Sequence, residues 1–235
     1  MKLIDLQEYL SSRTYPGRCV MLGRSADNQK AVIAYAIMGR SENSRNRIFE
    51  PTEDGIRTRA FDESKMTDPS LIIYHPVRRL GTTTIVTNGD QTDTVRDGLA
   101  AGKSYIEALR NRQFEPDPDN YTPRISGVLN QDGSFALSIL KSSDGDPAGN
   151  HRYFYEYDPP KAGEARLIHT YQEDKNPLPS FEGEPIRVAV AAQNAQALAD
   201  LIWAGLNEQN KVSLYTAFVD LTTGETDSVI VNKHR

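Results

Sequence analysis

Residues 31–38 are apolar at every position, and this stretch constrains the fold more than any other part of the chain. Successive side chains of a β-strand point to opposite faces, so a strand that is apolar throughout has both of its faces covered. We therefore expect a central strand in a sheet that lies between two other layers.

Most of the other predicted elements are strands that follow one another as hairpins. The turn at residues 130–133, Asn-Gln-Asp-Gly between two β-prone runs, is a strong hairpin signal. A short helix is expected at residues 3–10, and amphipathic helices are expected at 93–113 and 191–207 because apolar side chains recur there at helical spacing. The predicted strands cover residues 18–23, 30–38, 71–77, 82–87, 125–129, 134–140, 151–157, 165–171, 212–221 and 228–231.

The order of these elements selects the fold class. The strands at 151–157 and 165–171 flank a Pro-Pro-Lys-Ala-Gly-Glu turn, which predicts a further hairpin. Strands and helices do not alternate along the chain, which argues against a doubly wound parallel sheet. The pattern predicts an α+β protein with largely antiparallel sheets and helices stacked on their outer faces. A single domain over residues 1–235 is expected at this length.

A polar and crowded loop at residues 87–94, Thr-Asn-Gly-Asp-Gln-Thr-Asp-Thr, lies between a predicted strand and a predicted helix. The free N–H groups and the dipole of a helix N-terminus favour an anionic or carbonyl-bearing ligand there. A purely structural role is the alternative, because Asn88-Gly89 is a common turn and Thr92, Asp93 or Thr94 is an ordinary N-cap. Spacing alone leaves both interpretations open.

The charge distribution narrows the class of ligand. A net charge of −5 argues against extended nucleic-acid binding, which needs a basic surface. Arginines nevertheless concentrate in the first third of the chain, and guanidinium groups bind phosphate bidentately. A small phosphorylated ligand fits this pattern, and a solvated rim of the sheet is the alternative. The arginines concerned are Arg24, Arg40, Arg45, Arg47, Arg78 and Arg79.

Several common chemistries have no signal in the sequence. The four histidines form no metal-ligand spacing, and the glycine-rich phosphate-loop and serine-hydrolase motifs are missing. Cys19 is the only cysteine, so we expect no internal disulfide and a buried, inert thiol. The remaining arginine, amide, hydroxyl, tyrosine and carboxylate groups suit a reaction without cofactor or metal, in which protons move and a carbonyl is polarised.

The chain also lacks the features of a membrane or secreted protein. No window approaches the ~20 apolar residues of a membrane span. Asp5 and Glu8 interrupt the apolar N-terminal stretch, and a small-residue cleavage pattern is missing. We expect a cytoplasmic protein that binds neither membrane nor nucleic acid.

Four segments in the same order resemble the archaeal-type IMP cyclohydrolases. They are Gly39-Arg40-Ser41 with Asn46-Arg47, Tyr74 at a strand end, the loop at 87–94, and Thr122-Pro123-Arg124-Ile125. The resemblance covers roughly residues 17–140. It implies a four-layer αββα sandwich similar to the N-terminal-nucleophile hydrolases, with residues 1–16 as an N-terminal extension. The implied reaction closes 5-formamidoimidazole-4-carboxamide ribotide to IMP and water, the last step of purine biosynthesis. A homo-oligomer, a tetramer in the family, is also implied.

The resemblance assigns roles to individual side chains. Arg40, Arg45 and Arg47 are expected to hold the 5′-phosphate, and an insertion of two residues leaves open whether Arg45 or Arg47 does so. Arg124 is expected at the ring carbonyl or the oxyanion, Glu115 or Asp93 takes the amide proton, and Tyr74 protonates the leaving oxygen. The remaining expected substrate contacts are Asn88, Gly89, Gln91, Thr92, Asn120 and Thr122.

Two other functions remain as alternatives. Members of the family often carry histidine where Gln91 stands, which favours a non-catalytic purine-ribonucleotide-binding protein. An amidohydrolase of the αββα class is the third possibility, although it needs a nucleophile freed at the N-terminus and this chain starts Met1-Lys2.

Overall fold

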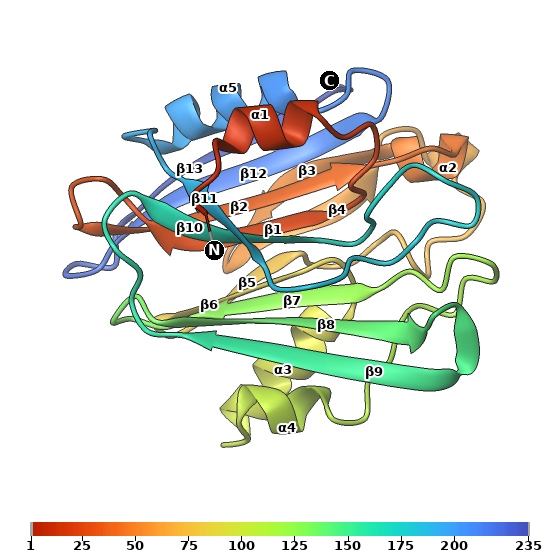
Figure 1. Cartoon of the computed structure of the whole chain (residues 1–235), viewed down its shortest axis with the longest axis horizontal. Helices are drawn as coiled ribbons and strands as arrows, with labels where there is room; N and C mark the ends of the chain where they lie inside the picture. The colour runs from red at the N-terminus through yellow and green to blue at the C-terminus, as the bar shows by residue number, and fades with distance from the viewer. Residues whose placement is uncertain (1, 235) are drawn as a thin grey trace.

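The computed structural model describes residues 2–234 and has four layers, in the order helices, sheet, sheet, helices (Figure 1). Met1, where the predicted N-terminal extension begins, and Arg235 lie outside the described residues. The predicted α+β class with largely antiparallel sheets is confirmed.

The first sheet has six strands in the order β11-β10-β1-β2-β12-β13, and every neighbouring pair is antiparallel. The expected hairpins at its centre and at its C-terminal edge are confirmed. Its strands are β1 (Cys19–Arg24), β2 (Lys30–Met38), β10 (Glu164–His169), β11 (Ile186–Ala189), β12 (Lys211–Asp220) and β13 (Thr226–Asn232).

The second sheet has seven strands in sequence order from β3 to β9, again all antiparallel. Its strands are β3 (Arg47–Thr52), β4 (Gly55–Ala60), β5 (Val77–Leu80), β6 (Thr83–Thr87), β7 (Arg124–Leu129), β8 (Phe135–Ser143) and β9 (Asp146–Tyr157).

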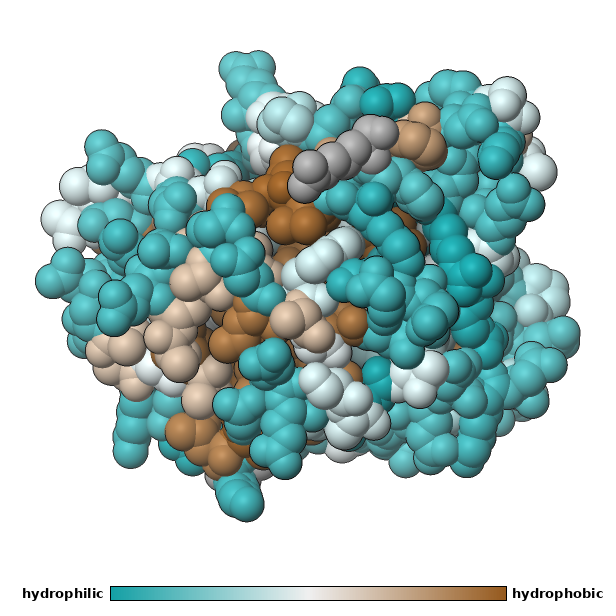
Figure 2. Space-filling view, turned by 90° about the horizontal axis from the view of Figure 1, so that it is seen from above, coloured by the Kyte–Doolittle hydropathy of each residue, from teal (hydrophilic) through white to brown (hydrophobic). Residues whose placement is uncertain are grey.

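Strand β2 is covered on both faces, as its apolar sequence predicts. Ile33, Tyr35 and Ile37 belong to the apolar cluster between the two sheets. Val32 and Ala34 belong to the cluster between the first sheet and the helices α1 (Leu6–Ser11) and α5 (Ala195–Gly205). Seen from above, hydrophobic residues gather in the middle of this helical face (Figure 2).

Helices α3 (Gln91–Ala100) and α4 (Tyr105–Leu109) cover the outer face of the second sheet. Two short helical segments, α2 (Glu42–Arg45) and the 3₁₀ helix η1 (Glu63–Lys65), flank the hairpin of β3 and β4. None of the described helices is long and apolar enough to cross a membrane.

The single helix predicted at 93–113 is wrong, because the chain forms two helices with a break at residues 101–104. Gly102 takes a left-handed φ of +78°, which ends α3 as glycine commonly does. Ser104 then starts α4 through a capping box with Glu107. Apolar spacing continues across the break, so periodicity alone did not separate the two helices.

The strand predicted at 71–77 is also wrong, because only Val77 belongs to β5. Thr58 Oγ1 instead donates to the carbonyl of Ile72 and accepts from the Tyr74 N–H. Pro76 has no N–H to give to a strand ladder. Tyr74 is thereby held in a loop at the entrance of β5.

The hairpin predicted for 151–157 and 165–171 does not form. Strand β9 is the edge of the second sheet, whereas β10 lies in the first sheet, so the proline-containing turn connects the two sheets. Strands β3, β4 and β11 were not predicted. Their sequences are short and carry Arg, Glu or Pro, which removes the apolar alternation expected of a strand.

The approach of the two sheets at Gly127 gives a test of the layer order. A Cβ atom at Gly127 would lie 2.8 Å from Leu22 Cδ1 in the opposite sheet and 3.1 Å from Leu137 Cδ2. We expect Gly127→Val to lower the free energy of unfolding in urea by about 1–3 kcal/mol or more, because the space is already filled. Ala148→Val on the exposed part of β9 is the matched control and should change it by less than about 0.5 kcal/mol. Equal effects of the two substitutions would contradict the packing described.

Candidate functional site

A cluster of polar side chains is buried at one end of the space between the sheets. We call it the central cluster, and it consists of Arg18, Tyr35, Arg47, Tyr74, Glu115 and Arg124. Each member comes from a different segment of the chain. Arg18 precedes β1, Tyr35 lies in β2, Arg47 starts β3, Tyr74 precedes β5, Glu115 follows α4, and Arg124 starts β7.

Strand alternation explains why polar side chains enter this apolar space. Arg18 is two residues before Val20, and Arg47 is two residues before Phe49; both apolar side chains lie between the sheets. Because strand side chains repeat every two residues, the two guanidinium groups enter the same space at the strand ends. Tyr35 and Tyr74 join them, and their hydroxyls are hydrogen-bonded at 2.8 Å.

Four polar atoms of the central cluster are buried without a hydrogen-bond partner. They are Arg18 Nε, Arg47 Nη1, Arg47 Nη2 and Glu115 Oε1. Buried polar atoms are nearly always hydrogen-bonded, because an unmade bond leaves the full cost of desolvation. We infer that a polar ligand supplies the missing partners.

Burial also changes the acid–base behaviour of the cluster. Removal from water raises the pKa of Glu115 to about 7, although the charges of Arg18, Arg124 and Arg47 oppose this change. Burial lowers the pKa of Arg47, and the positive charge of Arg18 acts in the same direction. The site therefore holds a carboxyl group that changes its charge near neutral pH.

The Asn88-Gly89 corner forms one wall of the central cluster. The Asn88 carboxamide donates to the Pro123 carbonyl and accepts from the Ile125 N–H, so it fastens the loop to β7. Thr92 is buried and bonds to the Thr87 hydroxyl and the Gly89 carbonyl. The side-chain polar groups of Asn88 and Thr92 thus have protein partners.

Gly89 and Gln91 shape the position of Arg124. A Cβ atom at Gly89 would lie 2.5 Å from Arg124 Nη1 and 3.3 Å from Glu115 Oε1, so a larger residue there would displace Arg124. Gln91 Oε1 accepts from Arg124 Nη1 at 2.8 Å, while Gln91 Nε2 donates to Asn88 Oδ1. The side chain of Gln91 is a bridge between the corner and Arg124.

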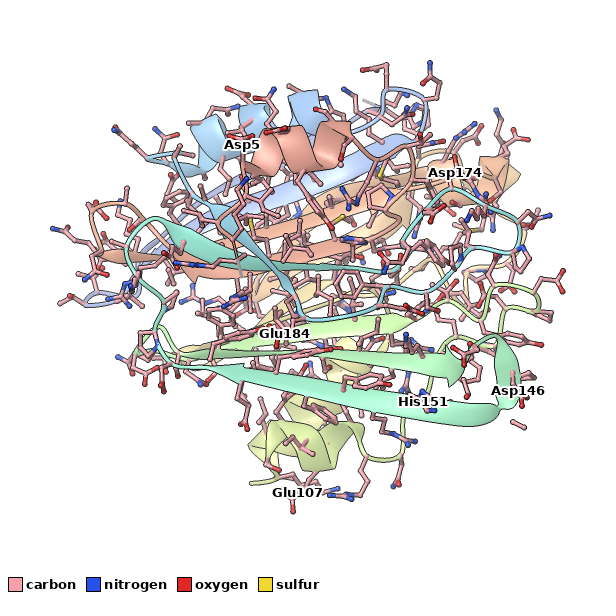
Figure 3. All side chains as sticks on the ribbon, in the orientation of Figure 1. Asp5, Glu107, Asp146, His151, Asp174 and Glu184 are labelled. Carbon is pink, nitrogen blue, oxygen red and sulfur yellow. The ribbon has the colours of Figure 1, made fainter. Side chains whose placement is uncertain are left out.

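A second group of predicted residues lies beside the cluster. Thr122 Oγ1 is hydrogen-bonded to the hydroxyl of Tyr171, and Tyr171 stacks on Tyr15 with ring centroids 5.8 Å apart. Arg40 lies over the Tyr15 ring and pairs with Asp174 at 2.9 Å. Asp174 is labelled in Figure 3, at the end of the sandwich where α2 lies. Asn120 accepts from the Leu178 N–H, which ties its loop to the segment after β10.

Two further predicted site residues, Asp93 and Arg45, have their partners outside both the central cluster and the group beside it. Asp93 pairs with Arg78 at 2.9 Å. Arg78 follows the inward-facing Val77, so this pair belongs to the outer face of the second sheet. Arg45 donates to the Gly39 carbonyl and to Asn210 Oδ1. The sequence left open whether Arg45 or Arg47 holds the phosphate. Of these two arginines, Arg47 is the one whose guanidinium lies in the central cluster.

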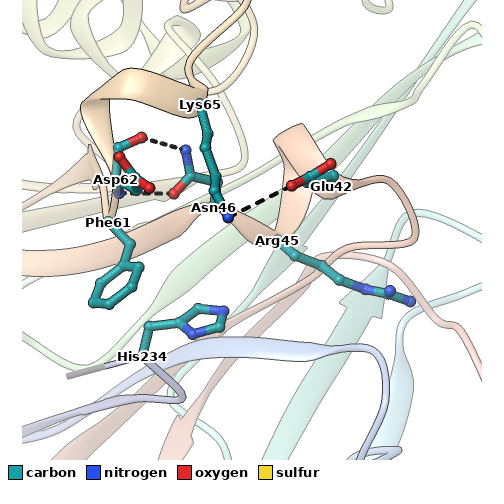
Figure 4. Close-up of a pocket in the computed structure, with 7 residues that line it drawn as sticks. All are labelled: Glu42, Arg45, Asn46, Phe61, Asp62, Lys65 and His234. Atoms are coloured by element: carbon teal, nitrogen blue, oxygen red, sulfur yellow. Dashed lines mark hydrogen bonds and ion pairs between the residues drawn. The ribbon is translucent and has the colours of Figure 1, made fainter.

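Arg45 instead lines a surface hollow of about 440 Å³ (Figure 4). Asn46 and Asp62 exchange two hydrogen bonds there, and Lys65 pairs with Glu42. The lining residues of this open hollow offer no buried, unpartnered polar atom. In this respect the hollow differs from the central cluster, which has four such atoms.

Four residues in or beside the central cluster were not predicted from the sequence: Arg18, Tyr35, Tyr15 and Tyr171. The sequence offered one signal for Arg18, which is the glycine that precedes it. Gly17 has a φ of +82°, and a Cβ atom there would lie 2.1 Å from Thr170 Oγ1. Tyr35 was hidden in an apolar strand, where an aromatic residue is expected to serve packing alone. Neither tyrosine of the stacked pair stood in a recognisable motif.

Cys19 and the histidines are not members of the central cluster. Cys19 is buried in the apolar cluster between the first sheet and helices α1 and α5, as expected, and burial raises its pKa to about 12. Among residues 2–234, no group of three or more His, Cys, Asp or Glu side chains could hold a metal ion. His169 is buried between Tyr9, whose hydroxyl lies 2.7 Å from its Nε2, and the Tyr171 carbonyl.

Comparison with known proteins identifies related sequences. A family model described as IMP cyclohydrolase-like protein matches residues 15–225. The IMP cyclohydrolase of Halobacterium salinarum is 31% identical over 132 residues, which cover 54% of this chain and 63% of the relative. That of Methanococcus aeolicus is 29% identical over 125 residues, covering 52% and 61%. That of Methanopyrus kandleri is 29% identical over 189 residues, covering 72% and 89%. The chain thus spans about three fifths of the length of the first two relatives.

The unpartnered guanidinium of Arg47 gives a test of the site that needs no ligand. We expect Arg47→Met to raise the free energy of unfolding of the ligand-free protein by roughly 1–3 kcal/mol, because it removes an uncompensated buried charge. Arg45→Met is the matched control, and it should lower stability because Arg45 has partners in Gly39 and Asn210. Urea unfolding of both variants is the measurement. A less stable Arg47→Met protein would show that Arg47 serves the fold and not a ligand.

Proposed function

Because the chain belongs to the IMP cyclohydrolase-like family, we propose that it closes 5-formamidoimidazole-4-carboxamide ribotide to IMP with release of water. The observation that carries this proposal is the set of unpartnered buried atoms on Arg18, Arg47 and Glu115. A planar purine precursor with formyl and carboxamide groups offers both the acceptors and the proton that these atoms lack.

The reaction needs positioning more than chemical activation. The carboxamide nitrogen attacks the formyl carbon of the same molecule, so both reacting groups are already tethered. The protein holds them roughly 3–3.5 Å apart and in line, which removes most of the entropic cost of the ring closure. Exclusion of water favours the loss of water from the carbinolamine that forms.

Arg47 is placed to stabilise the charge that develops on the formyl oxygen. Its two terminal amino groups are buried and free, while its Nε donates to the Ser44 carbonyl and fixes the direction of the fork. A donor that is oriented before the reaction stabilises an oxyanion without reorganisation. We assign this role to Arg47 in place of the phosphate contact expected from the sequence.

Glu115 and Tyr74 supply the proton transfers. Glu115 takes the proton of the attacking amide nitrogen, and a pKa of about 7 suits a general base at neutral pH. Tyr74 gives its proton to the departing oxygen, and the hydroxyl of Tyr35 holds it in place. Ring closure moves one proton from the attacking nitrogen to the formyl oxygen, and loss of water moves a second proton from a nitrogen of the carbinolamine to the same oxygen. Glu115 and Tyr74 act once in each step, and between the steps Glu115 returns its proton to the Tyr74 phenolate, so two protons leave with the oxygen as water.

The remaining predicted residues take supporting places. Arg40 lies at the partly exposed rim, where its guanidinium can exchange Asp174 for the 5′-phosphate. Arg124 faces the ring carbonyl, and Asn88, Gln91 and Thr92 form the wall that fixes it. Gln91 takes no part in this scheme of proton transfer, so glutamine in place of histidine removes no required group. The family resemblance also leads us to propose a cytoplasmic homo-oligomer of one-domain subunits, such as a tetramer, which light scattering of the purified protein would test.

Substitution of Glu115 tests the general base. We expect the wild-type protein to convert the formamido ribotide with the ultraviolet change of ring closure, with or without a chelator. Glu115→Gln should lower turnover by about 10²–10⁴-fold. The base must be ionised, so kcat/KM of the wild type should fall as the pH drops below about 7, where Glu115 gains its proton. Binding of IMP in calorimetry without any ring closure would instead identify a non-catalytic ribonucleotide-binding protein.

Substitution of Tyr74 tests the general acid. Tyr74→Phe should lower kcat by roughly 10²-fold with little change in substrate binding, because it removes only the proton donor. Tyr153→Phe is the matched control, since Tyr153 is 43% exposed on the edge strand β9. Equal turnover of the two variants would remove Tyr74 from the mechanism.

A further inference from the structure

Asp90 stands at the N-cap position of α3, yet its side chain makes no capping hydrogen bond. Its Oδ1 accepts from Arg112 Nη2 at 2.5 Å and forms an ion pair with Arg124 Nη1 at 2.7 Å. An aspartate at this position ordinarily caps the helix. Here the carboxylate is used for two guanidinium groups, one of which belongs to the central cluster.

Arg124 lies between two carboxylates that compete for it. Its Nη1 is 2.7 Å from Asp90 Oδ1 and 3.9 Å from Glu115 Oε1. The side chain of Asp90 is 52% exposed, whereas that of Glu115 is 3% exposed. The buried carboxylate, which would gain more from the guanidinium, is therefore the more distant of the two.

We propose that Asp90 is a positioning residue that holds Arg124 away from Glu115 and so keeps the Glu115 carboxylate free to accept the proton of the substrate. This inference rests on the proposed role of Glu115 as general base. Arg124 Nη1 also donates to Gln91 Oε1 at 2.8 Å, but this neutral partner holds it less strongly than a carboxylate does. Without Asp90, Arg124 would move toward Glu115 and form a charge-assisted hydrogen bond with it, and a carboxylate satisfied in this way is a weaker base.

The charged groups that face Glu115 are Arg18, Arg124, Arg47 and Asp117. Asp90 acts on Glu115 through Arg124, and removal of its negative charge also favours the ionised form of Glu115 directly. Both effects lower the pKa of Glu115. Loss of Arg112 should change the pKa of Glu115 in the opposite direction. It leaves Arg124 as the charged partner of Asp90, and it removes a positive charge from the site.

Two substitutions with opposite expected effects test this inference. Asp90→Asn keeps the shape and the N-cap preference of aspartate, and it should lower the pH midpoint of Glu115 by about one pH unit. Arg112→Met should raise the midpoint. Asp97→Asn is the matched control, because Asp97 is an exposed residue of α3 that pairs with Arg96, and it should leave the midpoint unchanged.

The midpoint is measured on the full chain by ¹³C NMR with glutamate labelled at its carboxyl carbon, and the signal lost in Glu115→Gln identifies Glu115. Opposite shifts in Asp90→Asn and Arg112→Met support the inference. An unchanged midpoint, or shifts in the same direction, would overturn it.

Turnover separates this inference from the proposed function. The acid limb of kcat/KM should move with the NMR midpoint, so Asp90→Asn should keep activity to lower pH while its maximal turnover falls. A turnover-competent Asp90→Asn protein with an unshifted Glu115 overturns the role of Asp90 and leaves the proposed function intact. A wild-type protein without ring closure overturns the proposed function, and with it the role of Asp90 in catalysis, whatever the NMR midpoints show.

Discussion

Charged side chains are buried between two apolar sheets, and the fold has to offset the cost of that burial. Arg47 is 0% exposed and Glu115 is 2% exposed, and neither has a full set of partners. Burial of an unpaired charge is costly, so the surrounding fold must supply the stability that these residues remove. The long apolar strand β2 and the clusters on both of its faces provide it. The free-energy cost of the buried charges is thus offset by the stability of the two apolar clusters.

The polar loop after β6 supports the site. Asn88 and Thr92 use their side chains within the protein, and Gly89 lies close to Arg124. Helix α3 begins after Asp90, so Thr92, Asp93 and Thr94 are not its N-cap, and contact of the loop with a ligand stays a prediction. The corner is a structural turn, and its structure places a guanidinium beside the carboxyl group of Glu115.

Local features of the fold could be predicted wherever neighbouring residues decide the structure. The strand at β2, the hairpin of β7 and β8, and the final hairpin follow from apolar runs and turn residues. The break at Gly102 could have been read from the Ser104 and Glu107 capping box, but the apolar spacing across it was given more weight. The crossing from β9 to β10 could not be predicted, because sheet membership depends on partners distant in the chain.

The fold class and the family follow from composition, periodicity and short motifs, which neighbouring residues carry. The tertiary structure sets which of the predicted side chains meet. It brought Tyr74, Arg47 and Glu115 together with the unpredicted Arg18 and Tyr35, and it kept Asp93 and Arg45 apart from them. The physical reason is that segments distant in the chain pack around each of these side chains. They set how deeply the side chain is buried, and burial in turn sets its pKa and how many of its hydrogen bonds stay unmade.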